Sequence, residues 1–177
     1  MSDPIYNAFL ARQLEEGQRL AASSDLFTLE PLPGSEPAAR FILEFRCKGL
    51  AREQGRVVEK NLWHIGVFFP ENYLRAAVHV SEVLTYLGPV LEPWHPNIRA
   101  PFICMHLTPG ASLVDITLGL YDLLTWNLFA TGDEGLNHAA AQWSRHQDPR
   151  RLPVDRRPLK RRMVTLDVQP LTTGGPP

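Results

Sequence analysis

The sequence has no run of about 18 consecutive apolar residues, so it predicts no helix that spans a membrane. Its first residues, MSDPIYNAFLARQLEEG, lack both the basic start and the apolar block of a secretory signal. There are only two cysteines, Cys47 and Cys104, which allow at most one disulfide. Because no export signal precedes them, we expect both to be free thiols in a reducing, cytoplasmic environment. There is no Gly-rich phosphate loop either, and we expect neither a nucleic-acid nor a membrane partner.

The net charge of −1 is small because two segments of opposite charge nearly cancel. Residues 1–147 carry 11 Lys and Arg against 16 Asp and Glu, whereas residues 148–162 carry seven Lys and Arg against two Asp. The 177 residues, 44% of them apolar, are enough for one ordinary globular domain. We therefore predict an acidic domain at 1–147 and a basic, Pro- and Arg-rich tail at 148–177.

Hydrophobic periodicity predicts an α+β fold. Asp3 and Pro4 form an N-cap and a first helical position, and apolar residues then follow at helical spacing, which predicts a helix over 4–22. Short alternating segments with turns between them predict an antiparallel meander of four strands. These strands are expected at 26–32, 39–50, 57–69 and 76–87.

The second half of the chain changes character. Five prolines interrupt residues 88–112, so we expect no regular element there. A long irregular segment that is rich in aromatic and reactive side chains is more typical of a functional site than of a linker. Helical spacing returns over 112–129, with Leu128 on its apolar face and Ser112 as its cap, and again over 136–146. The tail holds one strand-like patch, at 163–171.

Three motifs in this order resemble those of the ubiquitin-conjugating enzyme family. The first is Phe-Pro-Glu-Asn-Tyr at 69–73, the second is Trp-His-Pro-Asn-Ile at 94–98, and the third is Ile-Cys at 103–104. In the family, a catalytic cysteine follows the His-Pro-Asn signature by about ten residues; here the separation is nine. Residues 113–126 are similar to the helix after that cysteine, and 135–143 to the entry of the next one. The resemblance therefore covers about 4–146 and implies a catalytic domain with the ubiquitin-conjugating fold, called UBC-like below.

The chain departs from the family pattern at three places. Leu74 and the Ala76–Ala77 pair stand where the family has prolines that shape a ligase-docking loop, and the segment before His95 is longer. No long pair of C-terminal helices follows His146. Such a shortened form is similar to bacterial relatives encoded beside a ubiquitin-like protein and its activating enzyme, in sets implicated in antiphage defence.

The resemblance assigns roles to four residues. Cys104 would accept a ubiquitin-like protein as a thioester and pass it to an amine, and Asn97 would stabilise the oxyanion or hold the loop. His95 would be structural support, with its ring bonded to nearby backbone, and Asp133 would orient the incoming amine. It also implies three partners: a ubiquitin-like protein, a target protein, and an activating enzyme docked on the first helix near Arg12 and Arg19.

The residues alone leave other interpretations open. Cys104 lies in an apolar patch where a buried cysteine would be inert, Asn97 after a proline can close a turn, and Asp133 lies in a turn-forming stretch. A non-catalytic binding module of the same fold is one alternative. A cysteine hydrolase that uses Cys104 with His106 or His138 is another. Zinc ligation by His95, Cys104 and His106 fits no known spacing, and we expect no metal or cofactor.

Overall fold

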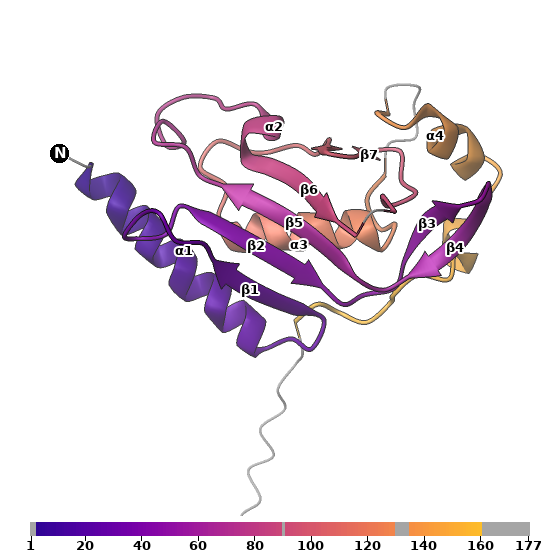
Figure 1. The fold of residues 1–177 in the computed structure, drawn as a ribbon, viewed down its shortest axis with the longest axis horizontal. Helices are drawn as coiled ribbons and strands as arrows, with labels where there is room; N and C mark the ends of the chain where they lie inside the picture. Colours follow the sequence, from indigo (N-terminus) through magenta and orange to yellow (C-terminus); the bar gives the residue numbers. More distant parts are fainter. Residues whose placement is uncertain (1–2, 90, 130–134, 161–177) are drawn as a thin grey trace, which may run out of the picture.

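The computed structural model describes residues 3–89, 91–129 and 135–160, and it has a mixed α+β fold (Figure 1). The elements in chain order are α1 Pro4–Ala22, β1 Phe27–Pro31, β2 Arg40–Phe45, β3 Gly49–Glu53, β4 Arg56–Lys60, β5 Trp63–Phe68, α2 Val80–Val83, β6 Leu84–Gly88, β7 Ile98–Arg99, β8 Phe102–Ile103, α3 Leu113–Leu124, α4 His138–Ser144 and the 3₁₀ turn η1 Pro149–Arg151. The predicted α+β class, N-terminal helix and four-stranded antiparallel sheet are confirmed.

Helix α1 begins and ends where the sequence predicts. The Asp3 carboxylate accepts the Ile5 N–H at 3.0 Å, which satisfies one of the free donors of the first turn, and Pro4 needs no such partner. One buried side chain of α1 reaches across to α3. The Gln13 side-chain oxygen accepts the N–H of Leu113 at 2.8 Å, and Ser112 with Asp115 completes a capping box there. The two helices are therefore joined by a hydrogen bond as well as by apolar contacts.

The main sheet has the strand order β1-β2-β5-β6, and every neighbouring pair is antiparallel. Alternate residues of β2 and β5 are fully buried, and they pair in register: Leu43 lies opposite Leu29 on one side and Ile65 on the other. Helix α3 runs behind this sheet and α1 lies alongside β1 (Figure 1). The main core fills the space between the helices and the buried face of the sheet.

Two of the predicted strands are wrong as single elements, because each divides in two. The range 39–50 holds β2 and β3, and the range 57–69 holds β4 and β5, so that β3 and β4 form a separate two-stranded hairpin. The reason lies in bonds to distant residues. The Trp63 indole N–H donates to the Cys47 carbonyl at 3.0 Å, and both backbone groups of Lys48 bond to Asp155. The backbone between β2 and β3 is thus bonded outside the sheet.

Two further expectations need correction around the proline-rich segment. Of the range 76–87, only β6 is strand; before it the chain forms the one-turn helix α2, which His79 and Glu82 cap. The segment 88–112, where no regular element is expected, contains the short antiparallel pair β7–β8. Proline 101 lies in the turn between them, where no ladder donor is needed. This pair places Cys104 directly after a strand that is packed on β6.

The helix predicted over 112–129 ends earlier, at Leu124. Trp126 takes a left-handed backbone conformation with φ of 60°, which turns the chain away from the helix axis. Leu128 therefore does not lie on the apolar face of α3, as predicted, but is half exposed beyond the helix. The turn buries the Trp126 ring in a second core, which also contains Leu50, Trp94 and Leu152. The last helix is also shorter than its predicted range of 136–146.

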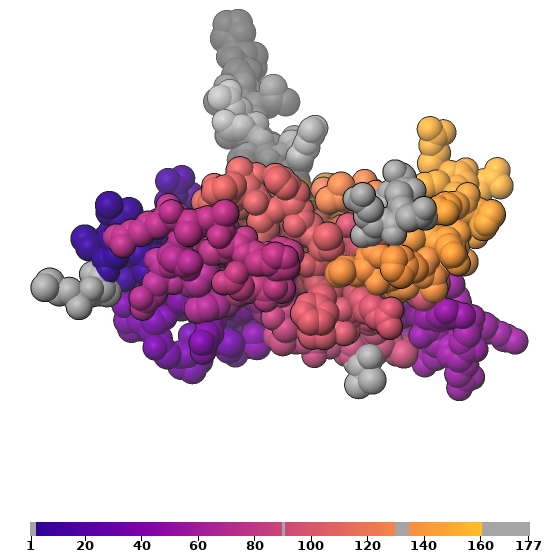
Figure 2. All heavy atoms as spheres, turned by 90° about the horizontal axis from the view of Figure 1, so that it is seen from above, coloured from indigo at the N-terminus to yellow at the C-terminus, as the bar shows by residue number. Residues whose placement is uncertain are grey.

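The beginning of the predicted tail packs on the domain. Residues 148–160, called the C-terminal strap below, cross from the second core, which receives Leu152 and Val154, to the main core, which receives Leu159. Asp155 is only 5% exposed, and its carboxylate accepts three bonds from Arg157 and one from the Lys48 N–H. Packing thus continues past the predicted boundary at residue 147. The strand-like patch at 163–171 lies outside the described residues. Figure 2 shows the strap and α4 beside the β3–β4 hairpin, opposite the N-terminus of α1.

We expect Asp155→Ala to lower the free energy of unfolding by about 2 kcal/mol at pH 7, because it leaves the part-buried Lys48 N–H without its acceptor and removes the buried carboxylate that Arg157 bonds. The hydrogen bond from Arg157 holds the pKa of Asp155 at about 2, below its ordinary value. The contribution is therefore complete above about pH 4 and is lost as the pH falls through 2. Urea unfolding at pH 7 and pH 3 measures both effects. Asp148→Ala, at an exposed cap, is the control; an equal loss in both variants would contradict the assignment.

Candidate active site

The segment from Trp94 to Cys104 forms a loop that is fixed at both ends. Its first end joins the hairpin and the second core: the Trp94 N–H donates to the Leu50 carbonyl at 2.6 Å, and the Trp94 ring is buried. Its second end joins the main core, which contains Ile98 and Ile103 of the β7–β8 pair. The loop therefore spans the two cores and is held by each of them.

His95 is buried inside this loop, and both ring nitrogens are bonded to backbone. Nδ1 accepts the Asn97 N–H at 3.1 Å, so that Nε2 must carry the proton and donate to the Leu128 carbonyl at 3.0 Å. Burial lowers the pKa of His95 to about 3, and the ring is therefore neutral at physiological pH. Because no lone pair remains, His95 can serve neither as a general base nor as a zinc ligand in this arrangement. Its position is the one expected of structural support.

Asn97 bonds to Cys104 through two of its groups. Its carbonyl accepts the Cys104 N–H at 2.7 Å, and its side-chain amide donates to the Cys104 carbonyl at 3.0 Å. The Asn97 backbone is in turn bonded to His95. The chain of contacts thus runs from the buried ring through Asn97 to the backbone of Cys104. Three of the four predicted site residues are brought together, while Asp133 lies outside the described residues.

Cys104 is exposed, whereas its two neighbours are held against the protein. Ile103 is buried before it, and Met105 packs against the main core after it. The Met105 methyl group approaches α3 so closely that a Cβ at Gly119 would lie 2.5 Å from it. Because Gly119 has no side chain, the Met105 methyl group can pack directly against α3. The second cysteine contrasts with the first: Cys47 is buried, and burial raises the pKa of its thiol to about 12.

The hydrolase arrangement finds no partner for the thiol in the described ranges. His106 and His138 are both exposed, and no described histidine is hydrogen-bonded to Cys104. No group of three or more metal-binding side chains occurs among the described residues.

Several supports of the loop could not be recognised in the sequence. The Pro96 carbonyl accepts the Asn137 N–H at 2.9 Å, and a Cβ at Gly135 would lie 2.9 Å from the same oxygen, so the entry of α4 is pressed against the loop. The Glu92 carboxylate accepts the Ala100 N–H at 2.6 Å in the β7–β8 turn. Of these supports, the sequence indicates Asn137 alone, because it falls in the stretch 135–143 that is similar to the family's helix entry. Glu92 lies in the lengthened segment, for which the resemblance offers no guide.

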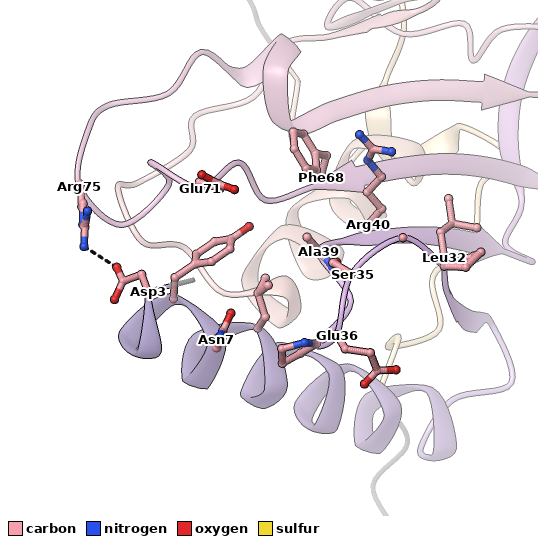
Figure 3. A pocket seen from close by; sticks show the side chains of 15 residues that line it. Asp3, Asn7, Leu32, Ser35, Glu36, Ala39, Arg40, Phe68, Glu71 and Arg75 are labelled. Atoms are coloured by element: carbon pink, nitrogen blue, oxygen red, sulfur yellow. Dashed lines mark hydrogen bonds and ion pairs between the residues drawn. The ribbon is translucent and has the colours of Figure 1, made fainter. Parts of the chain in front are cut away.

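The first helix presents its predicted partner residues to solvent. Arg12 forms an ion pair with Glu16 at 2.8 Å and Arg19 pairs with Glu15, each one turn apart on the outer face. A cavity of about 690 Å³ opens at the N-terminus of α1, between Asp3, Asn7 and the loop before β2 (Figure 3). Arg75 lies at one side of this cavity and is paired with Asp3. Arg12 and Arg19 do not line it.

The turn motif at 69–73 is part of the packing, as expected. Phe69 and Tyr73 are buried, with ring centroids 4.8 Å apart, and the Tyr73 hydroxyl donates to the Ala111 carbonyl at 2.8 Å. Tyr6 of α1 donates its hydroxyl to the Phe69 carbonyl. The motif thus connects α1 to the segment between Cys104 and α3.

No protein-family model matches this chain, and a search of curated protein sequences finds no significant match either. Within the described residues, no helix combines the length and the apolar character that crossing a membrane requires.

We expect the imidazole of His95 to show no titration between pH 5 and 8, because burial and two backbone bonds keep it neutral. Nitrogen chemical shifts of the histidine rings, recorded across this range, should identify a constant Nε2–H tautomer. The exposed His106 is the comparison ring within the same chain. A His95 ring that becomes doubly protonated near pH 6 would contradict the arrangement.

Proposed function

We propose that this protein is a conjugating enzyme of the ubiquitin type, which carries a ubiquitin-like protein as a thioester on Cys104. The observation that carries the proposal is an exposed thiol whose backbone is bonded on both sides to the asparagine of a His-Pro-Asn motif. A thiol that is accessible while its backbone is fixed is what acyl exchange between large proteins requires. The α+β fold, with its helix, sheet, site segment and helices in this order, is in keeping with a UBC-like fold.

The proposed reaction has two acyl transfers. First, the Cys104 thiolate attacks the thioester carbonyl of the ubiquitin-like protein on its activating enzyme; the new C–S bond forms as the old one breaks, and the activating enzyme's cysteine leaves as a thiolate. In the second transfer, an amine of the target attacks the same carbonyl. An amide forms, Cys104 leaves as a thiolate, and the proton lost by the amine passes to solvent or to a nearby carboxylate. Asp133 stays our candidate for that carboxylate.

For Asn97, the contacts favour the loop-holding role. Its amide donates to the Cys104 carbonyl, so that the side chain already fixes the residue that carries the thioester. An amide donor in this place can also approach an oxyanion if the bond to Cys104 is exchanged during the reaction. His95 supports both roles because its ring accepts the Asn97 N–H and so orients the Asn97 backbone.

The proposed partners follow from the same resemblance. An activating enzyme would dock on α1 near Arg12 and Arg19, and a target protein would approach Cys104 from solvent. We place the reaction in the cytoplasm of a bacterium, as part of an antiphage conjugation system. The non-catalytic module and the hydrolase gain no specific support: the first leaves the exposed thiol without a use, and the second lacks a histidine bonded to Cys104 among the described residues.

Incubation with a ubiquitin-like protein, its activating enzyme and ATP should yield a covalent adduct that reducing agents cleave. Cys104→Ser should instead form an adduct that resists reduction, because an oxygen ester replaces the thioester. Cys47→Ala is the matched control and should load normally, since that thiol is buried. Denaturing gels with and without reductant measure the outcome. Absence of an adduct in the wild type, or its survival in Cys104→Ala, would exclude the proposal.

We expect Asn97→Ala to slow transfer to an amine roughly ten- to hundredfold, because the backbone of Cys104 loses one of its two bonds to Asn97. Single-turnover discharge of a preloaded adduct to free lysine measures this step apart from loading. Asn127→Ala is a suitable comparison, as that asparagine lies after α3 and contacts Asp122 rather than Cys104. Equal discharge rates for Asn97→Ala and the wild type would remove Asn97 from the site.

A further inference from the structure

The charges of the described residues are divided between two ends of the molecule. We call residues 48–60, which include the β3–β4 hairpin, and residues 135–160 the basic end. Together these two ranges carry ten Lys and Arg against four Asp and Glu. The remaining described ranges carry six Lys and Arg against twelve Asp and Glu. The two parts thus have net charges of +6 and −6. Figure 2 shows the two segments of the basic end side by side, away from the N-terminus of α1.

The basic side chains of the strap project from a segment whose apolar residues are packed in the two cores. Leu152, Val154, Asp155 and Leu159 are buried along the strap, whereas its arginines are exposed. Arg151 has a side chain that is 88% exposed, and Arg150 makes no side-chain ion pair with any described residue. Asp148 fixes the backbone from which they project, because its carboxylate accepts the Arg150 N–H at 3.0 Å and its carbonyl accepts the Arg151 N–H at 2.9 Å. The guanidinium groups of Arg150 and Arg151 therefore project into solvent from a bonded backbone, where they can reach an anionic partner.

A hollow of about 780 Å³ lies within this basic end, between the hairpin, α4 and the strap. Its apolar lining includes Leu50, Val57, Trp143 and Pro153, and Arg151 stands at its rim. Its two carboxylates already have cationic partners. Glu59 pairs with Lys48 at 3.8 Å and Asp148 with Arg151 at 3.6 Å. The hollow therefore has apolar side chains in its lining and lies in a region of net positive charge.

We propose that the basic end is a docking surface for an acidic polypeptide segment, which places one apolar side chain in this hollow. The surrounding positive charge would attract the carboxylates, and the apolar lining would hold the anchoring side chain. The surface is separate from Cys104 and does not depend on its chemistry. Within the proposed function, it is a second contact by which a partner protein is held.

The lining favours a polypeptide over a single-stranded nucleic acid. Sequence-independent binding of single strands relies on aromatic planes that stack on bases. At this end, the aromatic rings contact one another: Trp143 meets Trp94 and Trp126 edge-on, and the Arg52 guanidinium covers Trp94. The other apolar residues of the lining are aliphatic, which suits a leucine-like side chain, and polar side chains such as His146 and Gln147 line the rest.

Fluorescence anisotropy with the full chain tests the proposal. The probe is a fluorescein-labelled nine-residue peptide of alternating Glu and Asp with a central Leu. We expect saturable binding that weakens as salt is raised from 50 to 200 mM. The same peptide with Ser at its centre should bind about tenfold more weakly, since it has no anchor. Failure to saturate, or equal affinity of the two peptides, would overturn the proposal.

Two double variants locate the site. Arg150→Ala with Arg151→Ala should weaken binding of the leucine peptide by about tenfold. Arg12→Ala with Arg19→Ala removes the same charge from exposed α1 positions and should change the affinity less than about twofold. Equal weakening in both would mean attraction by net charge alone, which contradicts a defined site. Tighter binding of a labelled nine-nucleotide thymidine strand than of the peptide would assign the surface to nucleic acid instead.

Discussion

The arrangement of the candidate site depends on one buried, neutral imidazole. His95 donates to Leu128 and accepts from Asn97, so it joins the turn after α3 to the loop that carries the thiol. A buried ring with two backbone partners can exist in only one tautomer, and it fixes the direction of both bonds. If the ring were charged, Nδ1 would become a donor facing the N–H of Asn97. The neutral ring, which burial favours, is therefore the form whose two bonds hold the loop in place.

The two cysteines show how environment separates chemistry within one residue type. Cys47 follows β2 in a buried position, where its carbonyl accepts the Trp63 indole N–H and desolvation holds the thiol protonated. Cys104 follows β8 in an exposed position, and Ile103 and Met105 hold the backbone on either side. Exposure without freedom of the backbone distinguishes the second thiol. A reagent or protein from solvent can reach Cys104, while the packed sheet excludes it from Cys47.

Local signals predicted those parts of the fold that local bonds determine. Helix α1 has its cap and first-turn proline in adjacent residues, and its bounds follow from them. The break between β2 and β3 could not be predicted, because Lys48 bonds to Asp155, which lies 107 residues further along the chain. Likewise, a helical pattern extends past Leu124, but the burial of Trp126 in the second core overrides it. For the site, the motifs selected His95, Asn97 and Cys104, and the helix-entry stretch included Asn137, but the supports contributed by Leu128 and Glu92 could not be predicted.

The loop that carries Cys104 lies between the two cores and packs against both of them. Trp94 packs with the hairpin and the strap, while Ile103, next to the thiol, packs in the main core. The intervening residues are bonded to one another through His95 and Asn97, and Asn97 is bonded to the backbone of Cys104. The basic end borders that same second core through Leu50 and Leu152. A partner that presses into the hollow would therefore act on two residues of the core that holds Trp94.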